Sequence, residues 1–217
     1  MEAESSHRPR RDPEGTRLRL LEAATAEFAA HGFEGARVER VVVAAGVTTR
    51  MLYHYFGDKD GLYVAVLEAA YAELRTGERR LDLDIGAPEE ALDRLVRYTF
   101  DFFQSNQVFV RLTQGENLLS GRRARRSKSI REMSQPLIDG IGRLIERGVA
   151  SGAFTSRPDP LQLYISIVAL SAHHINNRHT LGVVFGRDLA EEGWIAARRE
   201  HAVEMIMRHV GARSGAL

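Results

Sequence analysis

The feature that most constrains the fold of this chain is the regular return of apolar residues every three or four positions, which predicts helices. The pattern recurs near both ends of the chain, at Leu18, Leu21, Ala24 and Phe28 and again at Leu163, Ile167, Leu170 and His174. No segment shows the alternation of apolar and polar residues that a half-buried strand requires. We therefore predict an all-α fold of about nine helices.

Composition excludes several classes of protein. The 217 residues include no cysteine, which rules out disulfides, thiolate nucleophiles and Cys-ligated metal centres. No apolar run approaches the roughly 18 residues of a membrane span, and the polar N-terminus lacks the apolar segment of a secretory signal. We expect a cytoplasmic protein with no membrane partner. Of the 30 basic residues only Lys59 and Lys128 are lysines, so nearly every cation is a guanidinium suited to carboxylate or phosphate.

Prolines and glycines predict where helices begin and end. Asp12 and Pro13 begin a helix that Gly32 closes after His31, a second helix covers residues 38–45, and a short third helix of about eight residues follows Thr48 and Thr49. Further helices are expected at 58–80, 107–119, 161–180 and 188–210. We predict a mobile basic arm at 1–12 that includes Arg10 and Arg11, a trihelical domain at 13–57, a larger helical domain at 58–212 and a mobile tail at 213–217.

The most specific motif lies between Gly32 and Leu62. It reads Gly32-Phe33, Ala36-Arg37-Val38, Val41, Ala44-Ala45-Gly46-Val47, Thr48-Thr49-Arg50-Met51-Leu52-Tyr53-His54-Tyr55-Phe56, Lys59, Gly61 and Leu62. A helix-turn-helix needs a small residue in its first helix, a turn residue free of steric penalty and an exposed second helix, and Ala45 and Gly46 fit the first two needs. The motif resembles the TetR family of transcriptional regulators, closely over about residues 16–67 and only in helical layout beyond.

The resemblance implies that residues 48–55 form a recognition helix in the major groove of DNA. It assigns DNA contacts to Arg37, Thr48, Thr49, Arg50, Tyr53, His54 and Lys59. Arg50 is the best candidate for reading a guanine, and Lys59 matches the phosphate-contacting lysine of the family. Arg37 stands where many relatives have Ser or Thr, and Arg10 and Arg11 are candidates for a minor-groove arm.

The net charge of the N-terminal part does not by itself indicate DNA binding. Residues 1–62 hold nine Lys and Arg against ten Asp and Glu, so this part is not basic overall. Binding then depends on a local basic patch and on dimerisation, with acids such as Glu22 and Glu27 turned away. The alternative is a helical dimeric adaptor or architectural DNA-binding protein without operator specificity.

A DNA-binding domain of this kind needs about fifty residues, so some 150 residues remain, and sensing a ligand and dimerisation are their expected tasks. A small and polar stripe on the 161–180 helix and the apolar side of the last helix predict a four-helix dimer bundle, whose interface is assigned to Ala169, His173, Asn176, Trp194, Val203 and Ile206. Packing within one chain is the alternative for these residues.

Polar groups among apolar helical neighbours predict a cavity for an unidentified small molecule, lined by Phe103, Arg111, Glu116, Ile167, Leu170, His174 and Asn177. Taken singly, Arg111 and Glu116 also fit a surface ion pair, Phe103 a core residue and His174 a buried histidine. The helical layout and the length of the chain look similar to those of the TetR-family branch that contains pyrimidine-responsive regulators. This resemblance implies a small planar ligand.

An enzyme or a metal site is the remote alternative. His173, His174 and His179 are clustered, but their separations of one, five and six residues do not give the i, i+4 pair of helical metal ligands. We therefore expect no catalytic residues, no metal site and no cofactor. The function predicted is a TetR-type repressor that binds a near-palindromic double-stranded DNA operator as a homodimer and is released by a small-molecule effector.

Overall fold

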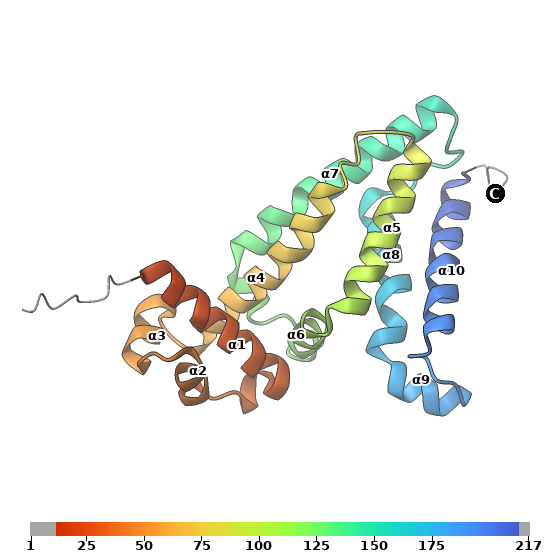
Figure 1. Cartoon of the computed structure of the whole chain (residues 1–217). Helices are drawn as coiled ribbons and strands as arrows, with labels where there is room; N and C mark the ends of the chain where they lie inside the picture. The colour runs from red at the N-terminus through yellow and green to blue at the C-terminus, as the bar shows by residue number, and fades with distance from the viewer. Residues whose placement is uncertain (1–11, 213–217) are drawn as a thin grey trace, which may run out of the picture. The chain divides into compact units, whose positions relative to one another are not determined.

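The computed structural model describes residues 12–212, which form ten α-helices and one 3-10 helix and contain no strand (Figure 1). The α-helices are α1 (Pro13–Gly35), α2 (Val38–Ala45), α3 (Thr49–Phe56), α4 (Lys59–Arg80), α5 (Pro88–Ser105), α6 (Gln107–Leu118), α7 (Lys128–Ser151), α8 (Pro160–Asn176), α9 (Arg178–Phe185) and α10 (Glu192–Val210), and the 3-10 helix η1 (Ala124–Arg126) precedes α7. The all-α prediction is confirmed, with ten α-helices in place of about nine. The predicted arm with Arg10 and Arg11 and the tail at 213–217 lie outside the described residues.

The chain divides into two compact units, one ending at Val66 and the next beginning at Leu67. The division falls within α4. The reason is that the first turns of α4 complete the core of the first unit. The ring of Tyr63 is 2% exposed and packs edge-on against Phe28 and Phe33, with centroids 4.8 and 5.3 Å apart.

Helix α1 begins and ends through local chemistry. The Asp12 carboxylate accepts the Gly15 N–H at 2.9 Å and caps the N-terminus, as predicted. Gly32 has the expected positive φ of 64°, and its non-helical ψ of 179° interrupts the helix where the sequence predicts an end. A further helical turn, counted with α1, follows beyond this kink to Gly35.

The core of the first unit is formed by apolar faces of its short helices. Leu20, Ala24 and Phe28 of α1 are buried, as are Val38, Val41, Val42, Ala45 and Leu52 of α2 and α3. Phe56 is only half-buried, with the Arg17 guanidinium 5.5 Å from its ring centroid. Helices of eight residues are marginal alone, so α2 and α3 depend on this packing.

The second unit has a large core shared by α5, α7, α8 and α10 and a smaller aromatic core shared by α4, α5, α6 and α8. The larger core centres on buried aliphatic residues such as Leu95, Leu144 and Ile167. The smaller one includes Phe102, Phe103 and Phe109. Hydrophobic burial of this extent is the main stabilising contribution to such a helical unit.

The predicted helix at 161–180 is divided in the structure. Asn177 has a φ of −119° and a ψ of 12°, and its side-chain amide donates to the His173 carbonyl at 2.9 Å, which ends α8 and starts α9. The last helix begins at Glu192 and not at Asp188, because the Asp188 carboxylate accepts the Ala190 N–H at 2.8 Å in a preceding turn. Polar side chains that bond their own backbone compete with helix continuation in this way.

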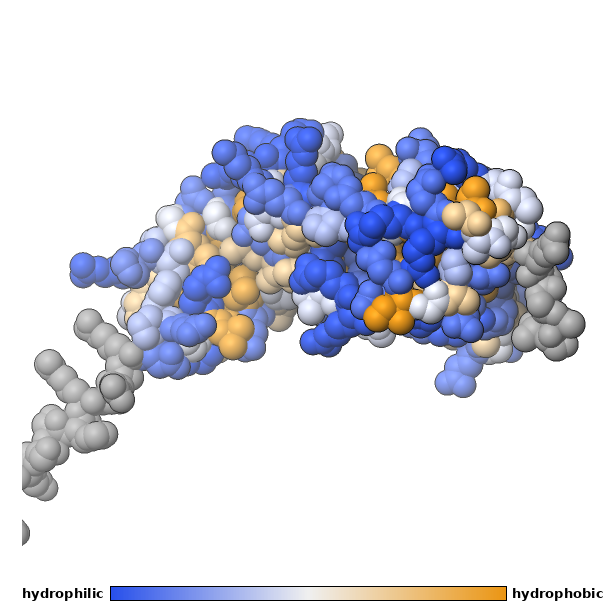
Figure 2. All heavy atoms as spheres, turned by 90° about the horizontal axis from the view of Figure 1, so that it is seen from above, coloured by the Kyte–Doolittle hydropathy of each residue, from blue (hydrophilic) through white to orange (hydrophobic). Residues whose placement is uncertain are grey.

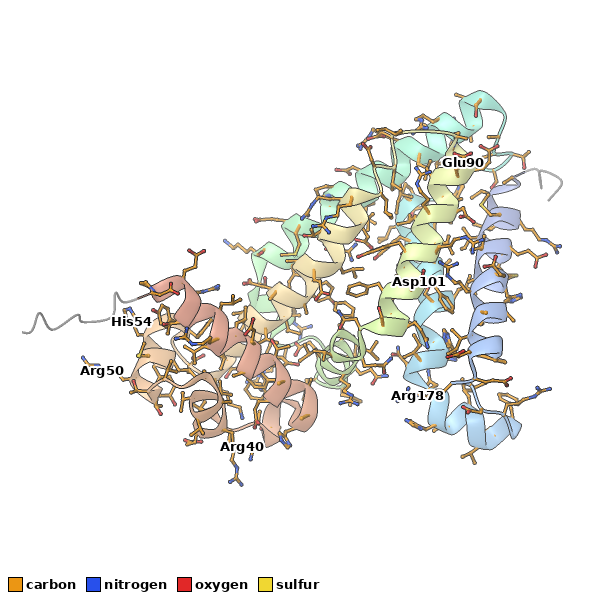
Figure 3. The ribbon with its side chains drawn as sticks, viewed as in Figure 1. Arg40, Arg50, His54, Glu90, Asp101 and Arg178 are labelled. Carbon is orange, nitrogen blue, oxygen red and sulfur yellow. The ribbon has the colours of Figure 1, made fainter. Side chains whose placement is uncertain are left out.

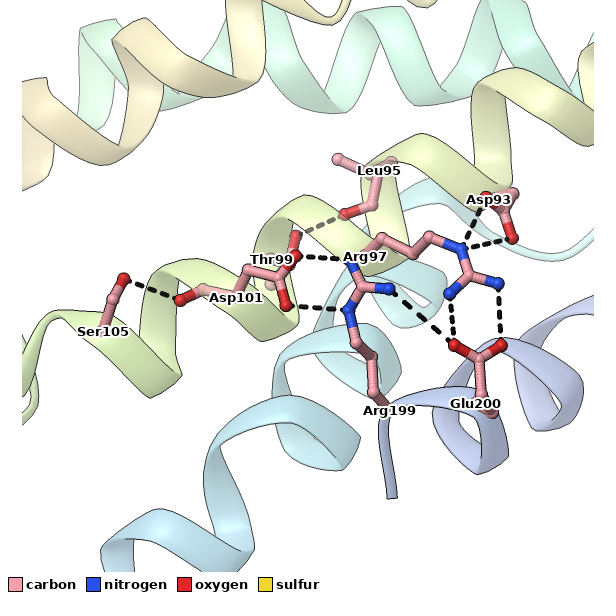
Figure 4. Close-up of polar contacts among 8 residues, drawn as sticks. All are labelled: Asp93, Leu95, Arg97, Thr99, Asp101, Ser105, Arg199 and Glu200. Carbon is pink, nitrogen blue, oxygen red and sulfur yellow. Dashed lines mark hydrogen bonds and ion pairs between the residues drawn. The ribbon is translucent and has the colours of Figure 1, made fainter. Parts of the chain in front are cut away.

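Ion pairs join α5 to α10 along the outside of the second unit (Figure 4). Arg97 donates to both oxygens of Glu200, at 2.5 and 2.8 Å, while its Nε bonds Asp93 on its own helix. Arg199 forms a second bidentate pair with Asp101. These bonds raise the pKa of Arg97 and lower that of Glu200, so both groups stay charged at neutral pH.

Polar and charged residues cover most of the face drawn in Figure 2, with smaller apolar areas between them. Across residues 12–212, every helix is too short or too polar to cross a lipid bilayer.

Candidate nucleic-acid interface and ligand cavity

Helix α3 turns most of its surface to solvent. Of its residues only Leu52 is buried, at 0% exposure, and it anchors the helix to the core of the first unit. Arg50, Tyr53 and His54 are exposed, and Thr49 is half-buried. A short helix with one fully buried residue and with Arg50, Tyr53 and His54 exposed has the form of a helix that docks into a DNA groove.

The turn between α2 and α3 is built from the two residues that the sequence indicates. Gly46 has a φ of 65° and a ψ of 38°, a left-handed conformation that favours glycine. The N–H of the next residue, Val47, donates to the Val42 carbonyl at 3.0 Å. Thr48 then caps α3, because its hydroxyl accepts the Met51 N–H at 3.4 Å. The predicted turn residue and N-cap are confirmed.

The cations of this unit differ in whether an acid neutralises them. Glu27 accepts from the Arg40 Nε at 2.7 Å and from the Arg37 N–H at 2.8 Å, and the bond with Arg40 lowers the pKa of Glu27. Arg50 makes no hydrogen bond or ion pair with the described residues, and Figure 3 shows its side chain extending away from α3. Glu27 is therefore engaged by α2, which leaves the Arg50 charge available to an anionic partner.

The other predicted DNA contacts also lie in the first unit. Arg37 is exposed at the N-terminus of α2, and Tyr53 is 47% exposed. The exposed His54 ring lies 5.4 Å from that of Tyr55. The Lys59 ammonium lies 4.6 Å from the Phe33 ring centroid, a cation–π contact that holds it at the start of α4.

The second unit contains a cavity of about 450 Å³. Its walls come from α4, α5, α6 and α8 and are mostly apolar or aromatic, with few polar groups: Tyr71, Leu74, Arg75, Phe103, Phe109, Thr113, Asn117, Leu161, Tyr164, Ile165, Val168, Ala169, Ala172 and Asn176. Both the volume and the composition are typical of small-molecule sites.

A buried polar triad of Arg75, Glu78 and Tyr164 lies beside this cavity, and two of its members, Arg75 and Tyr164, line it. The Arg75 Nη1 donates to the Glu78 Oε2 at 2.6 Å, and the Tyr164 hydroxyl donates to the Glu78 Oε1 at 2.7 Å. All three side chains are buried. Burial raises the pKa of Glu78, an effect that the nearby Arg75 charge opposes, and burial raises the pKa of Tyr164, which stays a neutral donor.

Of the seven residues predicted to line a ligand cavity, Phe103 lines this one. Ile167 is fully buried in the larger core, Leu170 packs beside that core, and Arg111 is exposed. These three side chains are not among the residues that line this cavity.

Glu116 has a structural role in place of the predicted ligand contact. It is buried, and its Oε1 accepts the backbone N–H groups of Arg123 and Ala124 at 2.6 and 2.9 Å. It thereby holds the start of η1. Arg123 is itself buried.

His174 is also separate from the 450 Å³ cavity. Its ring stacks on Phe100 at 5.2 Å and lies 5.4 Å from Trp194, beside a void of about 20 Å³. Burial lowers the pKa of His174 to about 4, so the ring is neutral at pH 7. Asn177, the last predicted ligand residue, ends α8 as described above and is not among the residues lining the cavity.

The predicted dimer-interface residues fall into two groups. Ala169, His173 and Asn176 are exposed on α8, and Trp194 is half-buried. Val203 and Ile206 are 8% and 2% exposed and belong to the core of their own chain. Their assignment to the interface is corrected, since α10 turns its apolar side inward.

Several residues of the cavity and of the polar triad beside it were not predicted from the sequence. Arg75 and Glu78 are three residues apart on a charged helix, a spacing usual for surface ion pairs. Tyr71 and Tyr164 lie on helices far apart in the sequence, and nothing in the sequence around either residue indicated that both would line one cavity. Asn176 was assigned to the dimer face although it also lines the cavity.

Comparison with known proteins identifies the family. Residues 20–66 match the profile described as bacterial regulatory proteins, tetR family, and residues 88–206 match the tetracyclin repressor-like C-terminal domain. The HTH-type transcriptional repressor NicS of Pseudomonas putida is 36% identical over 177 residues, which cover 82% of this chain and 84% of NicS. The chain belongs to the tetR family. It is a helix-turn-helix transcriptional regulator and not an enzyme.

Other relatives agree with this assignment. The HTH-type transcriptional repressor SCO4008 of Streptomyces coelicolor is 33% identical over 72% of this tetR-family chain and 78% of the relative. The HTH-type transcriptional regulator RutR of Escherichia coli is 27% identical over 89% and 90%. The crystal structure of the transcriptional regulator SCO4942 from Streptomyces coelicolor shares the fold, with a TM-score of 0.68 at 23% identity, and the match covers 91% of this chain and 99% of that one.

Proposed function

We propose that this tetR-family regulator is a repressor, which binds a near-palindromic operator as a homodimer and leaves it when a small molecule fills the cavity of the second unit. The observation that carries the proposal is the solvent-facing α3, whose Arg50 guanidinium has no partner among the described residues. A guanidinium at this place is suited to bidentate hydrogen bonds with guanine O6 and N7. Two copies of α3 then read the two halves of one operator.

Helix α4 supports a coupling between the cavity and the DNA-binding unit. It begins at Lys59 in the first unit and carries Tyr71, Leu74 and Arg75 in the cavity wall. A ligand that binds one conformation of this wall more tightly shifts the population toward that conformation, by at most its differential affinity. Exposed residues of α8, among them Ala169 and His173, are the proposed contact with the second copy.

Selection of bound sequences from a random duplex pool tests the proposal. A palindromic consensus that the dimer prefers by about 10³-fold or more over scrambled duplex is expected of a repressor. An equal affinity for both duplexes would instead favour the architectural or adaptor function. Binding of the protein to the most enriched duplex is then measured at two salt concentrations.

Two substitutions separate base reading from phosphate contact. Arg50→Ala is expected to weaken operator binding by about 1 to 3 kcal/mol and to relax preference at one base position. Lys59→Ala is expected to weaken binding to all duplexes and to lower the salt slope by about 1. Arg157→Ala, which removes an exposed guanidinium of the second unit, is the matched control. Equal losses on operator and scrambled DNA for both Arg50→Ala and Lys59→Ala would refute these assigned roles.

A further inference from the structure

The chemistry of the cavity wall indicates which class of ligand it accepts, starting from Arg75. This side chain is 6% exposed, and its guanidinium carbon lies 5.2 Å from the Tyr164 ring centroid. Glu78 balances its charge, and both Glu78 oxygens already accept a strong donor, from Arg75 and from Tyr164. The charges of Arg75 and Glu78 therefore cancel within the triad.

The triad is not complete in hydrogen bonds. The Arg75 Nε is buried and has no acceptor among the described residues. It is the one buried side-chain polar atom without a partner among the residues that line the cavity. Leaving such a donor unsatisfied is costly, so a ligand that turns the guanidinium toward the cavity and supplies an acceptor gains a hydrogen bond that the protein does not make itself.

The charge of the wall favours a neutral acceptor over an anion. Apart from Arg75, whose charge Glu78 balances, none of the cavity-lining residues is Lys, Arg, Asp or Glu. A bound carboxylate would bring a net negative charge into a largely apolar cavity with no second cation to compensate it. A carbonyl oxygen or a ring nitrogen would accept from the Nε–H without that cost.

The shape of the wall favours a planar ring. Tyr71 and Phe103 each meet Phe109 edge to face, with centroids 5.2 and 5.6 Å apart and interplanar angles of 77° and 79°. Together with Tyr164 they line the same cavity. Aromatic ligands gain from edge-to-face and offset contacts with such rings beyond the burial of their area.

We propose that the cavity binds a neutral, planar aromatic molecule whose carbonyl oxygen or ring nitrogen accepts the Arg75 Nε–H. The amides of Asn117 and Asn176 offer further hydrogen bonds to polar groups on the ring. The effector role of this molecule rests on the proposed function, whereas its binding does not.

The test is isothermal titration calorimetry of the full chain, without DNA, with three probes: 2-naphthamide, 2-naphthoate and decanamide. The first is aromatic and neutral, the second aromatic and anionic, and the third neutral and aliphatic. We expect 2-naphthamide to bind at least about tenfold more tightly than either of the others. Tighter binding of 2-naphthoate would overturn the neutral class, and tighter binding of decanamide would overturn the aromatic class. The absence of binding by all three up to about 1 mM would overturn the proposal as a whole.

Variants locate the binding. Arg75→Lys keeps a cation beside Glu78 but removes the Nε–H, and we expect it to lose roughly tenfold to a hundredfold in affinity for 2-naphthamide. Arg143→Lys, at an exposed pair with Asp84 outside this cavity, is the control and should bind like the original chain. Thr113→Phe fills the cavity from α6, and the Thr113 hydroxyl bonds only carbonyls of its own helix, so its removal leaves no donor elsewhere unpaired. Unchanged affinity in both Arg75→Lys and Thr113→Phe would place the ligand elsewhere and overturn the proposal.

Calorimetry without DNA keeps the two proposals apart. If 2-naphthamide binds in the cavity but no operator emerges from the duplex pool, the ligand inference stands and the repressor proposal fails. If an operator is found and the probe is not bound, the reverse holds.

Discussion

The buried pair of Arg75 and Glu78 gives the sharpest stability prediction. Glu78→Leu leaves a guanidinium that is 6% exposed without its anion and leaves the Tyr164 hydroxyl without its acceptor. Breaking a buried pair on one side costs about 3 to 5 kcal/mol in free energy of unfolding. Replacing both partners, as in Arg75→Met with Glu78→Leu, removes the unpaired charge but still leaves the Tyr164 hydroxyl without its acceptor, so the double variant should lose only about 1 to 3 kcal/mol.

A double-mutant cycle measures this difference. Urea unfolding at constant protein concentration and pH 7 is followed by the fluorescence of Trp194, the single tryptophan of the chain, which lies in the second unit. We expect a coupling energy of at least about 3 kcal/mol for Arg75 and Glu78. The exposed i, i+4 pair of Arg208 and Glu204 is the control, and its coupling should stay below about 0.5 kcal/mol.

One result would refute the reasoning. If the double variant is as unstable as the sum of the two single variants, the charges do not compensate each other in the folded chain. The triad would then be two separate polar groups, and the charge argument about the cavity would fail with it.

Two further predictions concern a histidine and two glycines. The folded chain holds His174 neutral with a pKa of about 4, whereas the unfolded chain takes up a proton on this ring near pH 6.5. The free energy of unfolding should therefore fall by on the order of 3 kcal/mol as the pH drops from the second value to the first. His174→Phe should flatten that part of the pH profile measured by urea unfolding. A His174→Phe profile as steep as the original would exclude this residue as the cause. The Cβ added by Gly46→Ala meets no atom within 4 Å, so this variant should lose about 1 kcal/mol in free energy of unfolding for its positive φ alone. A Cβ at Gly61 would lie 2.1 Å from the Phe56 carbonyl oxygen, so Gly61→Ala should lose about 2 kcal/mol or more. Thermal unfolding followed by circular dichroism ranks the two variants, and the opposite order would contradict the geometry.

The sequence allowed the first unit to be predicted because its signals are local. Gly46 and Thr48 specify a turn and a cap through their own backbone and hydroxyl, and the neighbouring apolar residues specify which side of each helix is buried. Asn177 is the counter-example, since nothing in the apolar spacing around it indicated that its amide would end α8.

The cavity was harder to predict because its walls come from four helices far apart in the chain. Tyr164 reaches Glu78 across 86 positions of sequence, and only that contact distinguishes Arg75 from an ordinary surface cation. The same limit explains Val203 and Ile206. Their spacing indicates an apolar face, but the partner of that face, α5 in the same chain or a second copy, depends on tertiary packing.

The continuity of α4 has a mechanical consequence. From Lys59 to Arg75 the helix rises about 24 Å without a break, at 1.5 Å per residue. A tilt of its axis by about 5° at the Arg75 end displaces the Lys59 end by about 2 Å, a shift larger than the tolerance of a hydrogen bond to a phosphate oxygen. Under the proposed function, a ligand then needs to reorient α4 only slightly to change how Lys59 meets DNA.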